Sequence, residues 1–123
     1  MSAAAPRFDE LIHPSTRLSI VAMLAAADWA DFSFLRDELG LSDSALSKQL
    51  STLEEAGYVA IDRPVSDSRR RVRARLTASG RSAFRGHVAA LQAIVGNVLS
   101  RAAKSTEAMH AARDAAVTSS KPH

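Results

Sequence analysis

The 123-residue chain contains no cysteine, which excludes disulfides, thiolate metal sites and cysteine nucleophiles. Glycine and proline are scarce, with five and four residues, and no stretch rich in them marks a linker. No apolar run approaches the roughly 20 residues that a membrane-spanning helix needs. The first residues also lack the apolar core of a secretory signal. The lack of a membrane-spanning run and of a secretory signal predicts a cytoplasmic protein.

Charge is distributed unevenly along a chain that is otherwise of ordinary composition, with 46% hydrophobic and 24% charged residues. Residues 1–41 carry three basic and six acidic side chains, whereas residues 42–85 carry nine basic and five acidic ones. Because clustered positive charge attracts a polyanion, we expect residues 42–85 to be the part of the chain that would bind one.

The segment from Ser42 to Gly57 organises the chain. Three leucines recur at helical spacing, with Ser42 as an N-cap before them and Gly57 as a helix end after them. These leucines are Leu46, Leu50 and Leu53. The opposite face is small and polar, through Ser44, Ser47, Lys48, Ser51 and Thr52. Such a face suits close approach to a ligand, although any solvated surface helix would also show it.

A shorter helix is predicted before this segment, capped by Ser33 and joined to it through Gly40-Leu41-Ser42. Two helices connected by a tight turn that contains glycine form a helix-turn-helix. Upstream, we expect a short helical arm over residues 8–12 and a buried apolar helix over residues 15–27. Phe32 is predicted to form a single short strand.

Residues 58–63 and 71–76 alternate between apolar and polar side chains, which predicts a β-hairpin. Its tip and second strand carry Arg69, Arg70, Arg71, Arg73 and Arg75. One or two arginines would suit an edge strand that charge protects from aggregation. Five would repel one another unless a phosphate backbone neutralised them.

A long helix capped by Thr77 is predicted over residues 78–103. Its apolar residues follow the spacing of a coiled-coil seam, through Phe84, Val88, Leu91, Val95, Val98 and Ala102, with Ile94 and Leu99 alongside. At about 39 Å, this helix is too long for a small domain to cover. We expect it to pair with a second copy of the chain; the alternative is a second helix over 106–117 that folds back. The predicted dimer interface comprises Phe8, Leu11, Ile12, Val88, Leu91, Val95, Val98 and Leu99.

Four sequence stretches stand out between His13 and Leu91: His13-Pro14 with Arg17-Leu18, Phe34–Leu39, Leu46–Val59 and Arg75-Leu-Thr-Ala-Ser-Gly-Arg81. Together they resemble the winged-helix transcriptional regulators related to the MarR and ArsR families. The resemblance implies a mainly α fold with a small β-hairpin, in which a winged helix-turn-helix precedes a long dimerisation helix. One domain would span 1–123, with the winged-helix core at 13–85, dimerisation elements at 7–12 and 86–117, and a flexible tail at 118–123.

The resemblance also implies a homodimer on operator DNA, with the 42–56 helix in the major groove and the wing along the backbone or in the minor groove. Asp67-Ser68-Arg69 is the nearest match to the Asp-x-Arg of MarR-type wings. Lys48 and Gln49 are the candidates for base reading, and Ser42 and Ser44 for phosphate. The full candidate set is Ser42, Ser44, Ala45, Ser47, Lys48, Gln49, Ser51, Thr52, Arg69, Arg70, Arg71 and Arg73.

Nothing in the sequence favours catalysis, because it shows no nucleotide-binding loop and no nucleophile elbow. The four histidines show no metal-ligand spacing, and without cysteine an ArsR-type metal sensor is disfavoured. We therefore predict a dimeric, sequence-specific regulator, a repressor by promoter occlusion, with no cofactor. The main alternative is a winged helix that binds proteins without selecting DNA. A small-molecule effector is a further possible partner, between the DNA-binding lobe and the dimer helices, with Trp29, Phe32 and Met23 as an apolar wall.

Overall fold

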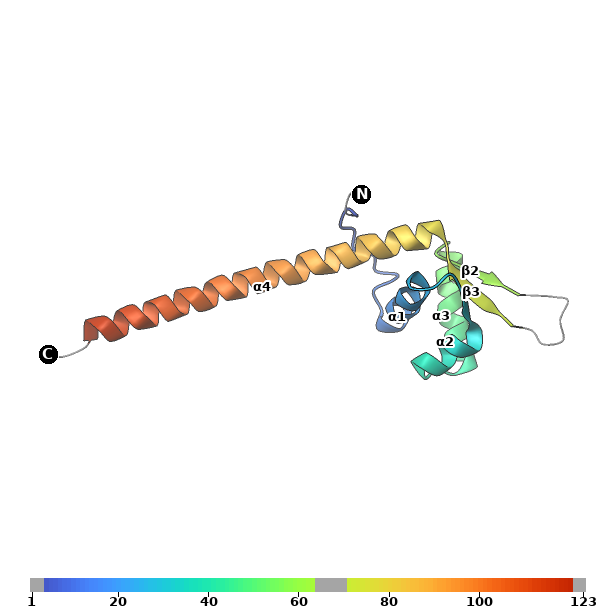
Figure 1. The fold of residues 1–123 in the computed structure, drawn as a ribbon, viewed down its shortest axis with the longest axis horizontal. Coiled ribbons are helices and arrows are strands. Elements are labelled where there is room, and N and C mark those ends of the chain that lie inside the picture. Colours follow the sequence, from blue (N-terminus) through green and yellow to red (C-terminus); the bar gives the residue numbers. More distant parts are fainter. Residues whose placement is uncertain (1–3, 64–70, 121–123) are drawn as a thin grey trace. The chain divides into compact units, whose positions relative to one another are not determined.

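The structure is a computed structural model that describes residues 4–63 and 71–120, with side chains described up to residue 113. The chain divides into two units, Met1–Ala90 and Leu91–His123. Its elements are α1 (Ser15–Ala25), β1 (Ala30–Asp31), α2 (Phe32–Leu39), α3 (Asp43–Glu55), β2 (Val59–Asp62), β3 (Arg73–Leu76) and α4 (Ala78–Ser120) (Figure 1). The predicted combination of helices with a small sheet is confirmed.

The core of the first unit forms where one apolar face from each of three helices meets the inner face of the sheet. Many of the apolar residues that the helical and strand periodicities predicted are completely or almost completely buried. They are Ile20, Val21 and Leu24 of α1, Leu35 of α2, Leu46, Leu50 and Leu53 of α3, and Val59, Ala74 and Leu76 of the strands. The core thus fixes α3 on its leucine side and leaves the opposite face free.

The sheet has three antiparallel strands in the order β1-β3-β2. Val59 lies opposite Leu76 and Asp62 opposite Arg73. Burial in β3 follows the predicted alternation, with Ala74 and Leu76 buried and Arg75 between them exposed. The strand predicted at Phe32 is displaced, because β1 is Ala30–Asp31 and Phe32 begins α2. Even so, the Phe32 backbone N–H donates to the Val72 carbonyl over 2.8 Å, which ties the start of α2 to the hairpin.

The predicted N-caps are confirmed at two of three helices. Ser42 caps α3 by accepting a hydrogen bond from the Ala45 N–H, as predicted. Gly40, at the end of α2, adopts a left-handed conformation with φ 63°, which allows the tight turn into α3. The predicted cap Ser33 is wrong, because α2 begins at Phe32 and Asp31 occupies the N-cap position without a side-chain bond.

Thr77 caps α4 by accepting from the Gly80 N–H over 3.0 Å, as predicted. The predicted end near residue 103 is wrong, since α4 is one helix of 43 residues. Alanine-rich sequence favours a continued helix. The fold-back alternative requires a turn before residues 106–117, and α4 continues through this region without one. Of the predicted tail, residues 121–123 lie outside the described part.

The predicted helical arm at residues 8–12 is also wrong, because these residues form a turn. The Asp9 carboxylate accepts from the backbone N–H groups of Leu11 and Ile12, at 2.9 and 3.3 Å. An aspartate side chain that bonds its neighbours' backbone in this way competes with helix formation. Ile12 is fully buried within its own chain, whereas Phe8 is 42% exposed.

Candidate nucleic-acid interface

The face of α3 that points away from the core is exposed along its length. Ser44, Ser47, Lys48 and Ser51 are exposed, and Ala45 and Thr52 border them as half-buried residues. Glu55 is also exposed near the same face, at its C-terminal end, a position that sequence reasoning did not assign. Because short side chains dominate, the α3 backbone can approach a ligand closely, and Lys48 is the cation of this face.

Gln49 differs from its neighbours because it is half-buried and lies on the side of α3 that faces α1. Its Oε1 accepts a 2.9 Å hydrogen bond from the guanidinium of Arg17, whose Nε donates to the Leu11 carbonyl over 2.6 Å. The oxygen of the amide is thus held by α1. The amide nitrogen is the group that Gln49 has left to offer a base edge, and it is a donor.

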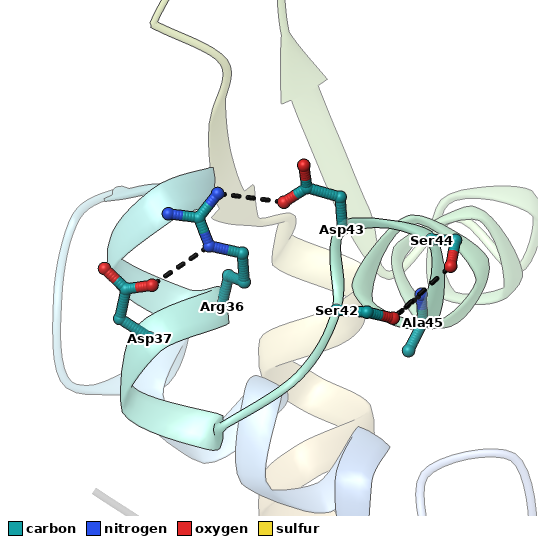
Figure 2. Close-up of polar contacts among 6 residues, drawn as sticks. All are labelled: Arg36, Asp37, Ser42, Asp43, Ser44 and Ala45. Atoms are coloured by element: carbon teal, nitrogen blue, oxygen red, sulfur yellow. Dashed lines mark hydrogen bonds and ion pairs between the residues drawn. The ribbon is translucent and has the colours of Figure 1, made fainter.

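The N-terminus of α3 presents hydroxyl groups and backbone N–H groups together (Figure 2). The Ser42 Oγ accepts from the Ala45 N–H over 3.1 Å and lies 3.3 Å from the Ser44 Oγ. A helix N-terminus with such donors is suited to bind an anion. However, the Ser42 oxygen is already engaged as a cap, so Ser44 is the freer of the two hydroxyls.

Figure 2 also shows a carboxylate at this N-terminus, that of Asp43, held by Arg36 from α2. The Arg36 NH1 lies 2.9 Å from the Asp43 Oδ1, and the Arg36 Nε lies 3.0 Å from the Asp37 Oδ1. The hydrogen bond to Asp43, followed by that to Asp37, raises the pKa of Arg36 above its ordinary value. The negative charge of Asp43 interacts favourably with the dipole of α3 but would repel a phosphate. The positive charge of Arg36 offsets that repulsion.

The described part of the wing presents exposed Arg71 and Arg75. Arg73 is half-buried, with its guanidinium 3.9 Å from the ring centroid of Trp29 and its Nε 3.9 Å from the Asp31 carboxylate. Arg73 is therefore engaged on the sheet, whereas Arg71 and Arg75 are available to a ligand. Arg69, Arg70 and the Asp67-Ser68-Arg69 match lie outside the described residues.

A groove separates α3 from the wing, and an ion pair between described residues crosses it. Arg63, just after β2, lies 3.6 Å from Glu54 of α3 through its NH1. Ser47 and Ser51 line the same hollow of about 230 Å³ together with Ile61 and Val72. Sequence reasoning missed Arg36 and Arg63, since their partners lie seven and nine residues away and the periodic patterns mark only buried faces.

The chain matches the family model described as "Winged helix DNA-binding domain". The match covers residues 16–95, which is more than half of the chain. The chain belongs to this family. The resemblance to winged-helix regulators is thereby confirmed, with α2 and α3 as the helix-turn-helix and β2 and β3 as the wing.

One curated relative and two solved structures are also similar to this chain. The uncharacterized protein MJ0432 of Methanocaldococcus jannaschii is 29% identical over 79 residues, which cover 64% of this chain and 86% of that protein. The transcriptional regulator homologue of Pyrococcus horikoshii OT3 superposes with a TM-score of 0.69 and 23% identity, covering 73% of this chain and 89% of that one. YusO of Bacillus subtilis gives 0.64 and 21%, covering 86% and 74%. These two structures show a shared fold.

The residues predicted for assembly of the winged-helix protein differ in exposure. In the second unit, Val95, Val98 and Leu99 are 53%, 53% and 63% exposed, and Ile94 beside them is 51% exposed. Val88 and Leu91 are half-buried, as is Leu11, which packs against the core of the first unit. A single chain therefore leaves one apolar stripe of α4 uncovered between residues 94 and 99.

Two of the side chains expected at an effector site, Trp29 and Phe32, line different hollows. Trp29 lines a hollow of about 320 Å³ with β2 and β3. Phe32 lines other hollows, one of them with Arg71. Among the described residues, no three or more histidines, aspartates and glutamates are placed so that together they could hold a metal ion. None of the described helices is long and apolar enough to cross a membrane.

Proposed function

We propose that this protein is a homodimeric transcriptional regulator of the cytoplasm that binds a pseudo-palindromic operator and represses by occluding the promoter. The exposed polar face of α3 beside an arginine-bearing wing supports the DNA contact. In this proposal Lys48 and Gln49 read bases from the major groove, Ser44, Ser47, Ser51 and Thr52 lie against phosphates, and the wing arginines follow the backbone.

The exposed apolar stripe on α4 supports pairing of two chains. Ile94, Val95, Val98 and Leu99 lie on neighbouring positions of one helix face, a width typical of helices that pack in bundles rather than stand alone. Two copies related by a two-fold axis would place their α3 helices about one DNA turn apart, roughly 34–36 Å. A small-molecule effector remains part of the proposal without an assigned cavity.

The test is selection from a random DNA library by the purified full chain, followed by anisotropy titrations of the selected site over a range of salt concentrations. A regulator enriches a two-fold-related sequence and loses affinity steeply with salt, whereas a protein-binding winged helix enriches none. Arg71→Ala and Arg75→Ala should each lower the salt slope by about one. Lys104→Ala, in the second unit, serves as the matched loss of one cation and should leave the slope unchanged.

A further inference from the structure

One histidine of the first unit has no place in DNA binding as described above. His87 of α4 is fully buried, the one buried polar side chain among the described residues. Its ring is packed by Phe8 with ring centroids 4.8 Å apart and by His13 at 5.3 Å. Both neighbours belong to the N-terminal segment, residues 7–13, that precedes α1.

Hydrogen bonds fix the proton positions on this pair of rings. The Asp9 backbone N–H donates to the His87 Nδ1 over 3.0 Å, so this nitrogen carries no proton. The neutral His87 ring then carries its proton on Nε2, which lies 3.3 Å from the His13 Nδ1 and donates to it. A second proton on either ring would place two N–H groups against each other. The arrangement therefore accommodates both rings only when they are neutral.

The same segment contacts the junction of α3, the wing and α4. The Asp9 Oδ2 accepts from the Tyr58 hydroxyl over 2.6 Å. Tyr58 donates its N–H to the Leu53 carbonyl at the end of α3 and accepts from the Thr77 N–H before α4. The hydrogen bond that the Tyr58 hydroxyl donates to Asp9, followed by burial, raises the pKa of Tyr58. The Arg7 N–H also donates to the Gly86 carbonyl over 2.9 Å, which adds a second tie to α4.

From this geometry we propose that His87 and His13 form a proton-sensitive positioning element for the DNA-binding surface, one that rests on the proposed function for its effect on DNA. When either ring gains a proton, residues 7–13 detach from α4 and Tyr58. The end of α3 and the base of the wing are then no longer held in position by this segment. His87 acts through Asp9 and Tyr58, so it is a positioning residue and not a DNA contact.

The sign of the pH dependence follows from the groups that face His87. Burial, and then the neighbouring His13, lower the pKa of His87, while the Asp9 carboxylate acts in the opposite direction. That carboxylate is already engaged by Tyr58 and two backbone N–H groups, so it offers limited compensation. A histidine with a lowered pKa favours the docked segment above the ordinary value near 6.5, and this preference is lost as the pH falls below it.

The first experiment follows the docked segment itself. Hydrogen exchange of the Asp9 amide in the full chain, corrected for the intrinsic rate, should lose up to about tenfold of its protection between pH 7.5 and pH 5.5, one unit below 6.5. His87→Asn supplies a non-titrating acceptor for the Asp9 N–H and should remove this pH dependence. His13→Gln, at an exposed position, should reduce it even if the buried substitution fails to fold. Protection that stays constant in the unaltered chain would overturn the proposal.

The second experiment reads the effect on DNA at constant ionic strength. General protonation of histidines adds positive charge and would strengthen binding at low pH. The positioning element predicts the opposite, a weaker affinity for the selected operator at pH 5.5 that His13→Gln diminishes. Acid-sensitive Asp9 protection without any DNA binding would reject the proposed function and keep the positioning element. If operator affinity rises as the pH falls while Asp9 protection is lost, the link between the docked segment and DNA binding is rejected.

Discussion

The Arg17 guanidinium of α1 holds the side-chain oxygen of Gln49 on α3 at 2.9 Å. These residues stand 32 positions apart, and the contact decides how one of the two proposed base readers can act. Lys48, one position earlier, is exposed and free to move. The two neighbours should therefore contribute to DNA binding in different ways.

We expect Gln49→Ala to weaken binding to the selected operator about fivefold while changing affinity for unrelated DNA little, because a single amide donor reads one base edge. Lys48→Ala should weaken both, since a flexible ammonium lies as readily against phosphate as against a base. Anisotropy titrations on operator and scrambled duplexes measure the difference. Equal losses from Gln49→Ala on the two duplexes would show that this amide does not read sequence.

The Arg36 and Asp43 pair leads to a prediction in which one substitution should correct another. Arg36→Ala leaves the Asp43 carboxylate uncompensated at the N-terminus of α3, so operator affinity should fall roughly fivefold. The melting temperature should change little, because an exposed pair adds little stability. Asp43→Asn in the Arg36→Ala background should restore affinity by removing the repelling charge. If the double variant binds as weakly as Arg36→Ala alone, Arg36 acts by another route.

Sequence patterns predicted the structural features that follow from regular spacing and local capping, and missed those that depend on contacts between distant residues. The leucines of α3, the alternation of the hairpin and the caps Ser42 and Thr77 follow local rules of spacing and hydrogen bonding. The Asp9 turn was missed because apolar residues at 8, 11 and 12 fit a helix equally well, and only the carboxylate's bonds to the backbone decide between the two. The Arg17–Gln49 contact requires the α1–α3 packing, which no spacing in the chain encodes.

Gly80 gives a test of packing at the start of α4. A β-carbon at this position would collide with the backbone of Tyr58 and with the Leu76 side chain. Gly80→Ala should therefore destabilise the protein by roughly 1–3 kcal/mol, since backbone cannot move aside as a flexible side chain does. Gly96→Ala in the same helix meets nothing within 4 Å and should stabilise it by up to about 1 kcal/mol. Thermal unfolding of both variants measures the contrast, and a harmless Gly80→Ala would contradict the close approach.

Charge placed on the exposed stripe of α4 tests the proposed dimer. Leu99→Glu puts a carboxylate among Val95 and Val98, where pairing would bury it, so two chains should separate at micromolar concentration. Asn97→Glu, also exposed but outside the predicted seam, carries the same added charge and should leave assembly unchanged. Sedimentation velocity gives the mass of each variant. Because a monomer holds only one α3, the Leu99→Glu protein should also lose most of its preference for a two-fold-related site over a single half-site. A Leu99→Glu protein that sediments like the unaltered chain would mean that this stripe is not the interface.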